Sequence, residues 1–106
     1  MIEGYPRAKL SVVPAPGQAL IERKEYAAKI RAARALLGWS QAELGQRVGV
    51  TQRSINRLEN ADVDVRRSTA VAIDAALKSE GIWFEELTSG GYRIVVQRRL
   101  RAAKPT

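Results

Sequence analysis

The stretch LGWSQAELGQRVGVTQRSINRLEN, residues 37–60, decides the fold of this chain. Ser40, with Glu43 three residues later, has the pattern of a capping box. In that motif the serine hydroxyl and the glutamate carboxylate each accept a hydrogen bond from a free amide at a helix start. The pattern predicts a helix over about 41–48, which Gly49 ends.

A second short helix follows directly. Thr51 is a second N-cap and predicts a helix over about 52–59. Gly45 is small where the two helices cross, and the positions that must pack between them are apolar. These positions are Leu44, Val48, Val50, Ile55 and Leu58. The arrangement is a helix-turn-helix, whose second helix projects from the surface and can enter a DNA major groove.

The outward face of this second helix is polar. It carries Gln52, Arg53, Asn56 and Arg57. Their spacing places all four side chains on one side of the helix. Glutamine and asparagine present the paired donor and acceptor that match adenine, and arginine matches guanine. We therefore predict that this face reads base pairs.

The composition favours a polyanionic partner. The 106 residues fit one domain, and the net charge is +7 with a sequence pI near 10.4. Thirteen of the 18 basic residues are arginine, whose planar fork suits phosphate and guanine. Residues 23–67 carry +5, from ten basic and five acidic side chains, and residues 93–106 carry +5 with no acid. Nucleic acid is therefore the first partner to consider, ahead of a membrane surface.

Cysteine and histidine are both absent from the sequence. Their absence excludes disulfides, zinc thiolate sites and cysteine nucleophiles, and it removes the commonest general base and metal ligand. No apolar run approaches the roughly 18–20 residues that span a bilayer, and no signal-peptide core is present. We therefore expect a cytoplasmic protein that is not an enzyme and that binds no metal and no cofactor.

The segments around the central motif have patterns of their own. Residues 1–22 contain three prolines and no helical period, which predicts an extended arm. Helical spacing of apolar residues predicts a helix over about 23–37. Ser68 or Thr69 is expected to cap another helix, which ends at about Glu80.

The C-terminal part is different in character. Two β-rich runs around a Gly-Gly turn predict a hairpin within residues 82–98, with a short helix over 82–87 as the competing interpretation. Residues 99–106 form a basic tail. The helical DNA-binding domain is accordingly expected over residues 23–81.

The central segment resembles the phage repressor and Cro-type helix-turn-helix family, also called the XRE family. The resemblance covers about residues 24–80 and rests on the string LGWSQAEL…VGVTQRSINRLE, with the small residue, turn glycine and apolar positions in place. It implies a mainly α fold, a compact repressor-like domain of four to five helices, to which this chain adds the C-terminal β-hairpin. It also implies DNA binding as a dimer and transcriptional regulation.

The resemblance also assigns roles to single positions. Gln41 matches a glutamine that contacts phosphate, and Asn60 and Arg67 fall where the family contacts the DNA backbone or the narrow minor groove. We expect Thr51 and Arg66 to contact the backbone as well. The base-reading positions correspond to Gln52, Arg53 and Arg57, with Asn56 assisting.

Two sets of charges in this region concern structure more than recognition. Arg34 and Glu59 match the positions of the family's internal salt bridge, and we expect them to fix geometry. Asp62 and Asp64 depart from the family pattern, since they place acid in a loop that usually approaches phosphate. They could pair with the two arginines that follow them, or they could hold the loop off the DNA.

The second strand of the hairpin is the candidate for dimerisation. Tyr92, Ile94 and Val96 alternate inward, while Val95 leaves the outer face partly apolar as well. A strand with apolar residues on both faces is expected to be covered. Pairing with a twofold mate would also hide its exposed edge.

The leading hypothesis is a sequence-specific regulator that binds double-stranded DNA as a homodimer on a palindromic operator. One alternative is an antitoxin-type regulator whose hairpin also holds a protein toxin. A second alternative is a bridging protein whose helix-turn-helix docks on other proteins and never reads bases.

Overall fold

The structure, a computed structural model, describes residues 18–97, with side chains from Leu20 onward. Within these residues the fold is mainly α, with a two-stranded antiparallel hairpin at the C-terminal end, as predicted. The elements are α2 (Gln18–Leu37), α3 (Gln41–Val48), α4 (Gln52–Glu59), α5 (Arg67–Ser79), β1 (Ile82–Glu86) and β2 (Tyr92–Val96). The predicted arm lies outside the described residues up to position 17, and the basic tail, residues 99–106, lies outside them entirely.

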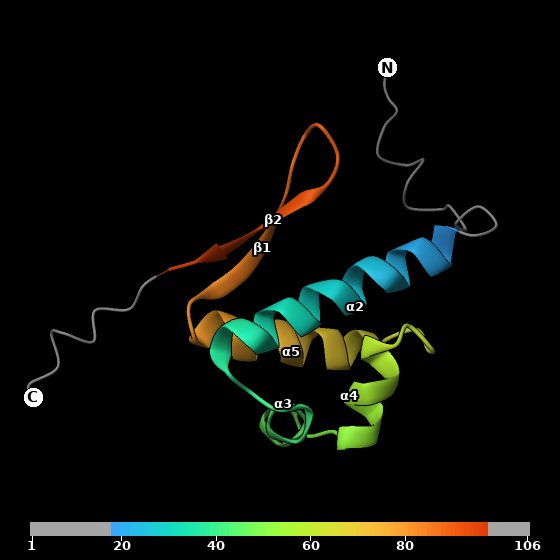
Figure 1. The fold of residues 1–106 in the computed structure, drawn as a ribbon, viewed down its shortest axis with the longest axis vertical. Helices are drawn as coiled ribbons and strands as arrows, with labels where there is room; N and C mark the ends of the chain where they lie inside the picture. Colours follow the sequence, from blue (N-terminus) through green and yellow to red (C-terminus); the bar gives the residue numbers. More distant parts are fainter. Residues whose placement is uncertain (1–17, 98–106) are drawn as a thin grey trace, which may run out of the picture.

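Helix α2 runs through the middle of the molecule. In Figure 1, α3 and α4 lie on one side of it and the hairpin rises on the other. Its sequence is rich in alanine, leucine, glutamate, lysine and arginine, which are strong helix formers, and this explains its length of 20 residues. Helix α2 is therefore the element to which both the helix-turn-helix and the hairpin attach.

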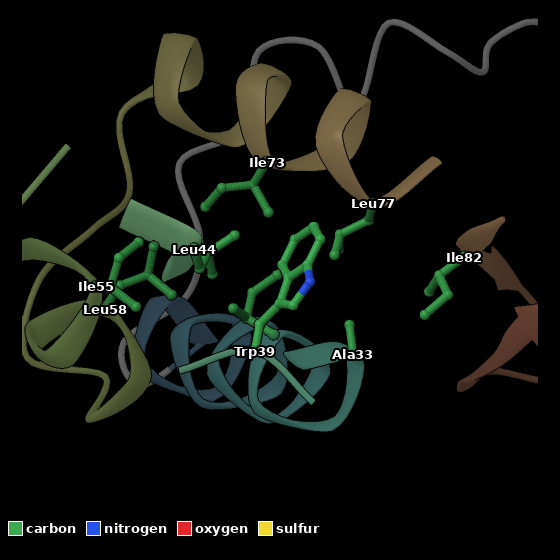
Figure 2. Close-up of a cluster of buried hydrophobic side chains, with 9 residues drawn as sticks. Ala33, Trp39, Leu44, Ile55, Leu58, Ile73, Leu77 and Ile82 are labelled. Atoms are coloured by element: carbon green, nitrogen blue, oxygen red, sulfur yellow. The ribbon is translucent and has the colours of Figure 1, made fainter. Parts of the chain in front are cut away.

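The core is a single apolar cluster that draws on every helix and on β1. Figure 2 shows Trp39 near its centre, between side chains of α2, α4 and α5, with Ile82 of β1 at one side. The cluster consists of Ile30, Ala33, Trp39, Leu44, Ile55, Leu58, Ile73, Leu77 and Ile82. The apolar positions predicted to join the two short helices are thus confirmed, three within the cluster and Val48 and Val50 packed against it.

The ends of α3 and α4 fall where their capping residues predict. The Ser40 hydroxyl accepts a hydrogen bond from the Glu43 amide at 3.0 Å, and the Thr51 hydroxyl accepts one from the Ser54 amide at 3.0 Å. Only half of the predicted capping box forms, because the Glu43 carboxylate binds Arg47 at 3.2 Å instead. An arginine one turn ahead offers that carboxylate a charged partner on the helix surface.

Two predicted helix starts are wrong. Helix α2 begins at Gln18, so residues 18–22 are helical and do not belong to the extended arm. The prolines that suggested extension all precede this start. Helix α5 begins at Arg67, after an extended Arg66 whose side chain makes no capping bond. Neither Ser68 nor Thr69 is therefore the cap, since both lie within the first turn.

Residues 82–86 form a strand, which decides between the two interpretations of that segment. Ile82 pairs with Val96 and Phe84 with Ile94 across the hairpin. Ile82 is buried, and Phe84 and Ile94 pack against the core, so these residues mark the inner face. Val96 has the inward parity but is 54% exposed, because it lies at the last position of β2.

Lys29 of α2 attaches the hairpin. Its ammonium lies 3.3 Å from the Glu86 carboxylate and 3.4 Å from that of Glu25. It also lies 4.5 Å from the centre of the Tyr92 ring and 5.5 Å from that of Phe84, which are cation–π distances. The hairpin is thus fixed to α2 by one lysine as well as by its inner apolar face.

Candidate nucleic-acid interface

The two short helices approach closely because residue 45 is glycine. A Cβ atom at Gly45 would lie 2.6 Å from the carbonyl oxygen of Val50, closer than real Cβ atoms come to any neighbour. The turn between the helices uses Gly49, whose φ of +82° lies in the left-handed region that glycine adopts freely. The backbone of this motif therefore fixes the direction in which α4 projects.

A buried ion pair holds α4 against α2. Glu59 is 2% exposed, and its two carboxylate oxygens accept hydrogen bonds from Arg34 at 2.8 and 2.9 Å. Arg34 also donates to the carbonyl of Trp39 at 2.9 Å. The hydrogen bonds that Arg34 donates to Glu59 raise the pKa of Arg34 above its usual value. The predicted salt bridge between Arg34 and Glu59 is thus present as a two-pronged contact, the geometry that fixes a pair most firmly.

A chain of amide side chains extends this pair toward the surface. Gln41, the first residue of α3, donates to Glu59 at 3.0 Å and accepts from Asn56 at 3.4 Å. Asn56 in turn accepts from Asn60 at 3.1 Å. Both ends of the Asn56 amide are therefore engaged within the protein. Each end keeps one further site, because an amide nitrogen carries two hydrogens and an amide oxygen two lone pairs.

The predicted DNA-facing side chains lie on one exposed surface. Gln41 is half-buried at its edge, and the others are exposed: Thr51, Gln52, Arg53, Asn56, Arg57, Asn60, Arg66 and Arg67. Helix α4 supplies the central part of this surface, and the start of α5 supplies Arg66 and Arg67. The folded chain thus exposes the base-reading and backbone-contacting candidates together.

The arginines of this surface have no carboxylate partner among the described residues, whereas most of the other described arginines do. Arg53, Arg57, Arg66 and Arg67 form no ion pair with any acidic residue between positions 18 and 97. In the same part of the chain, four of the five other arginines bind carboxylates, namely Arg23, Arg34, Arg47 and Arg93, and the fifth, Arg31, donates to the main-chain carbonyl of Glu59. An arginine with no acidic partner can give its whole donor fork to phosphate or guanine.

The loop between α4 and α5 is tied to α2. Arg23 donates to the Ala61 carbonyl at 3.2 Å and to the Asp64 carboxylate at 3.3 Å. Asp64 therefore pairs with a distant residue of α2, and not with Arg66 or Arg67, as the sequence left open. This contact joins residues 41 positions apart, and no local pattern in the sequence indicates it.

The same loop begins with a conformation that is unusual for alanine. Ala61 has a φ of +59°, and it is the one non-glycine residue with positive φ in the described part of the chain. Its amide donates to the main-chain carbonyl of Leu58, and the Asp62 amide donates to that of Arg57, both at 3.0 Å. These two bonds form a Schellman motif. The end of α4 is therefore well formed despite a residue that disfavours it.

Comparison with known families agrees with this geometry. The model of a family described as Helix-turn-helix matches residues 30–84, which is half of the chain and contains α3 and α4. No curated protein and no solved structure matches the chain. No helix between residues 18 and 97 is both long enough and apolar enough to cross a membrane.

Proposed function

This chain belongs to the helix-turn-helix family, of the XRE type, and is a DNA-binding transcriptional regulator; from this premise we propose that it reads a specific operator with α4. Helix α4 would enter the major groove, and two copies of the chain would bind the two halves of a palindrome. The role that we propose for each residue follows from its contacts.

The observation that carries the proposal is the set of unpaired arginines on one polar surface. Gln52 and Arg53 occupy the first turn of α4, and Arg57 lies one turn later on the same side. Their side chains are exposed, so they can reach base edges without breaking a contact within the protein. We assign base reading to these three residues.

Gln41 and Asn56 receive different roles. Gln41 is held between Glu59 and Asn56, which supports a fixed orientation of its amide toward a phosphate. Asn56, expected among the base readers, is proposed instead to position Gln41, because its own amide is already engaged by Gln41 and Asn60. Contacts to the DNA backbone are assigned to Thr51, Asn60, Arg66 and Arg67.

The homodimer is proposed because one helix reads too little sequence. A single recognition helix contacts only a few base pairs, and dimers of this kind double the site by placing two helices about 34 Å apart, one turn of the duplex. The operator should therefore be a palindrome with half-sites at that spacing.

The test is a selection of bound duplexes from a random library, followed by binding measurements on the selected site and on unrelated DNA. Arg53→Ala should weaken the selected site by about 1–3 kcal/mol and relax the preference at one base pair. Arg67→Ala should weaken both duplexes alike and reduce the salt dependence of binding by about one phosphate contact. Lys78→Ala removes one exposed positive charge at the far end of α5 and serves as the matched control.

Asn56 provides a further discrimination. If it positions Gln41, then Asn56→Ala and Gln41→Ala should weaken all duplexes by similar factors and leave base preference unchanged. A changed base preference in Asn56→Ala would return this residue to the readers. Equal losses on both duplexes for Arg53→Ala would contradict base reading by α4.

A further inference from the structure

The hydrogen bonds at the two ends of the hairpin show which main-chain groups of β2 point outward. The Leu87 amide donates to the Gly91 carbonyl at 3.0 Å, and the Gln97 amide donates to the Gly81 carbonyl at 2.7 Å. In an antiparallel ladder, hydrogen-bonded pairs alternate with pairs that turn their main-chain groups away from each other. With the register of this hairpin, the main-chain N–H and C=O groups of Arg93 and Val95 face β1.

The main-chain groups of Tyr92, Ile94 and Val96 consequently point away from β1, toward the edge of the sheet, although their side chains lie on its inner face. The sheet contains β1 and β2 alone among the described residues, so no strand there pairs with this edge. Strand β1, by contrast, also packs against α5. The outer edge of β2 therefore has main-chain groups with no strand partner among the described residues.

This edge lacks the features that normally prevent strand pairing. Native edges are blunted by proline, by bulges or by charged side chains. Strand β2 has no proline, and its register with β1 is continuous. Its one charged residue, Arg93, binds Glu85 across the hairpin at 2.7 Å. Val96 adds an apolar side chain that is 54% exposed at the end of the strand.

We propose that β2 pairs antiparallel with β2 of a second copy of this chain, which joins the two hairpins into one four-stranded sheet with a twofold axis at Ile94. This inference deepens the proposed function, because it assigns the homodimer interface on which palindrome reading depends.

The register follows from hydrogen bonding and from side-chain pairing. When the twofold axis passes through Ile94, Tyr92 lies opposite Val96 of the second copy and Ile94 lies opposite Ile94 of that copy. Every residue of the strand whose main-chain groups point to the edge then forms a hydrogen-bonded pair. Arg93 then lies opposite Val95, and no two like charges meet. A centre at Arg93 would place two arginines opposite each other, which is destabilising, and would shorten the overlap.

The strand composition favours a second copy over an unrelated peptide. Aromatic with β-branched and β-branched with β-branched are favourable cross-strand pairs, and self-pairing of Tyr92, Ile94 and Val96 produces only these. In this register the inner-face side chains of both copies lie on the same face of the four-stranded sheet. The two helical domains, which cover those inner faces, therefore lie on the same side of the sheet. A two-stranded hairpin is marginal by itself, and two further strands would stabilise it.

The absence of cysteine makes a direct test of the register available. Residues in a hydrogen-bonded antiparallel pair have Cα atoms about 5.5 Å apart, within the span of a disulfide. Ile94→Cys should therefore form a covalent dimer on mild oxidation. Val95→Cys should remain monomeric on denaturing gels, because residue 95 lies opposite residue 93. Efficient crosslinking through Val95→Cys, or none through Ile94→Cys in a folded protein, would overturn the proposed register.

A second test compares two substitutions at Val96, where the side chain is exposed and the fold should tolerate change. Val96→Pro removes an outward amide from each copy, whereas Val96→Ala keeps it. By sedimentation, Val96→Pro should raise the dimer dissociation constant roughly tenfold to a hundredfold, and Val96→Ala should have a much smaller effect. Unchanged dimerisation in Val96→Pro would contradict edge pairing.

The two proposals fail in different ways. If β2 is not the interface, the variants at positions 94 and 96 leave dimerisation and palindrome binding unchanged, and Arg53 still governs base preference. If α4 does not read bases, Arg53→Ala loses affinity equally on all duplexes while the Ile94→Cys dimer still forms. Capture of β2 by a different protein would appear as a monomeric purified chain without Ile94→Cys crosslinking, and would overturn the self-pairing proposed here.

Discussion

Helix α2 holds two parts of the molecule by two different cations. Arg34 binds α4 through the buried carboxylate of Glu59 in a two-pronged contact. Lys29 binds the hairpin through Glu86, whose side chain is 75% exposed, and through the faces of two aromatic rings. The first contact fixes both distance and orientation, and the second fixes distance alone. The helix that must meet DNA in one orientation thus has the directional contact, and the hairpin has the more adaptable one.

The largest loss of stability is expected when the Arg34–Glu59 pair is broken. Arg34→Met leaves the Glu59 carboxylate, which is 2% exposed, without its cation, and the free energy of unfolding should fall by about 3–5 kcal/mol. Glu86→Ala, which breaks the exposed pair at the hairpin, should cost less than about 1 kcal/mol. Urea denaturation of the two variants measures the difference. Similar losses would show that burial does not separate the two contacts.

The pairing itself is tested by a double variant. Replacing Arg34 with methionine in the Glu59→Ala background removes the unpaired charge, so the double variant should lose less than the sum of the two single losses. Additive losses would mean that the two residues act independently.

Next in size is the close approach of α3 and α4. Gly45→Ala would force the Val50 carbonyl away from its position, with a loss of about 1–3 kcal/mol in stability. Gln46→Ala, at the exposed neighbouring position, should be nearly neutral. Thermal melts compare the two variants, and a neutral Gly45→Ala would mean that the turn can move without cost.

A smaller effect is expected at the hairpin attachment. Lys29→Met keeps most of the side-chain length but removes the ion pairs and the cation–π contacts, and should cost about 1–2 kcal/mol. Hydrogen exchange should quicken in β1 and β2 more than in α4. Equal acceleration in both regions would show that the hairpin does not open separately.

The smallest effect has the opposite sign. Ala61 adopts a left-handed conformation that glycine adopts without strain, so Ala61→Gly should stabilise the protein by about 0.5–1 kcal/mol. Ala35→Gly, within α2, should destabilise it by about 1 kcal/mol. Denaturation midpoints decide, and destabilisation by Ala61→Gly would show that unfolded-state entropy outweighs the relief of strain.

Sequence reasoning succeeded where a residue acts on its own neighbours. Ser40, Gly49 and Thr51 mark the ends of α3 and α4 correctly because their capping bonds span four residues or fewer. It failed at the start of α5, where the preceding Arg66 makes no capping bond that a pattern could reveal. The alternation in the last strand predicted the inner face, but it could not show that Val96 lies beyond the cover of the helices.

The sequence predicted which residues form the candidate site better than it predicted the hydrogen bonds between them. The exposed face of α4 follows from helical periodicity, and the Arg34–Glu59 pair follows from resemblance to the family. The bonds from Asn56 to Gln41 and from Arg23 to Asp64 join residues 15 and 41 positions apart. Such contacts depend on how the helices pack, and composition or spacing carries no signal for them.

The attachment through Lys29 also bears on how the chain folds. Arg34 and Glu59 are 25 residues apart, whereas Lys29 and Glu86 are 57 apart, so the hairpin contact closes the longer loop. Closing a longer loop costs more chain entropy and tends to come later in folding. Contacts that form after the folding barrier slow unfolding without accelerating folding. We therefore expect the Lys29 contacts to form late in folding. Their loss should shorten the lifetime of the native state while the refolding rate stays nearly unchanged.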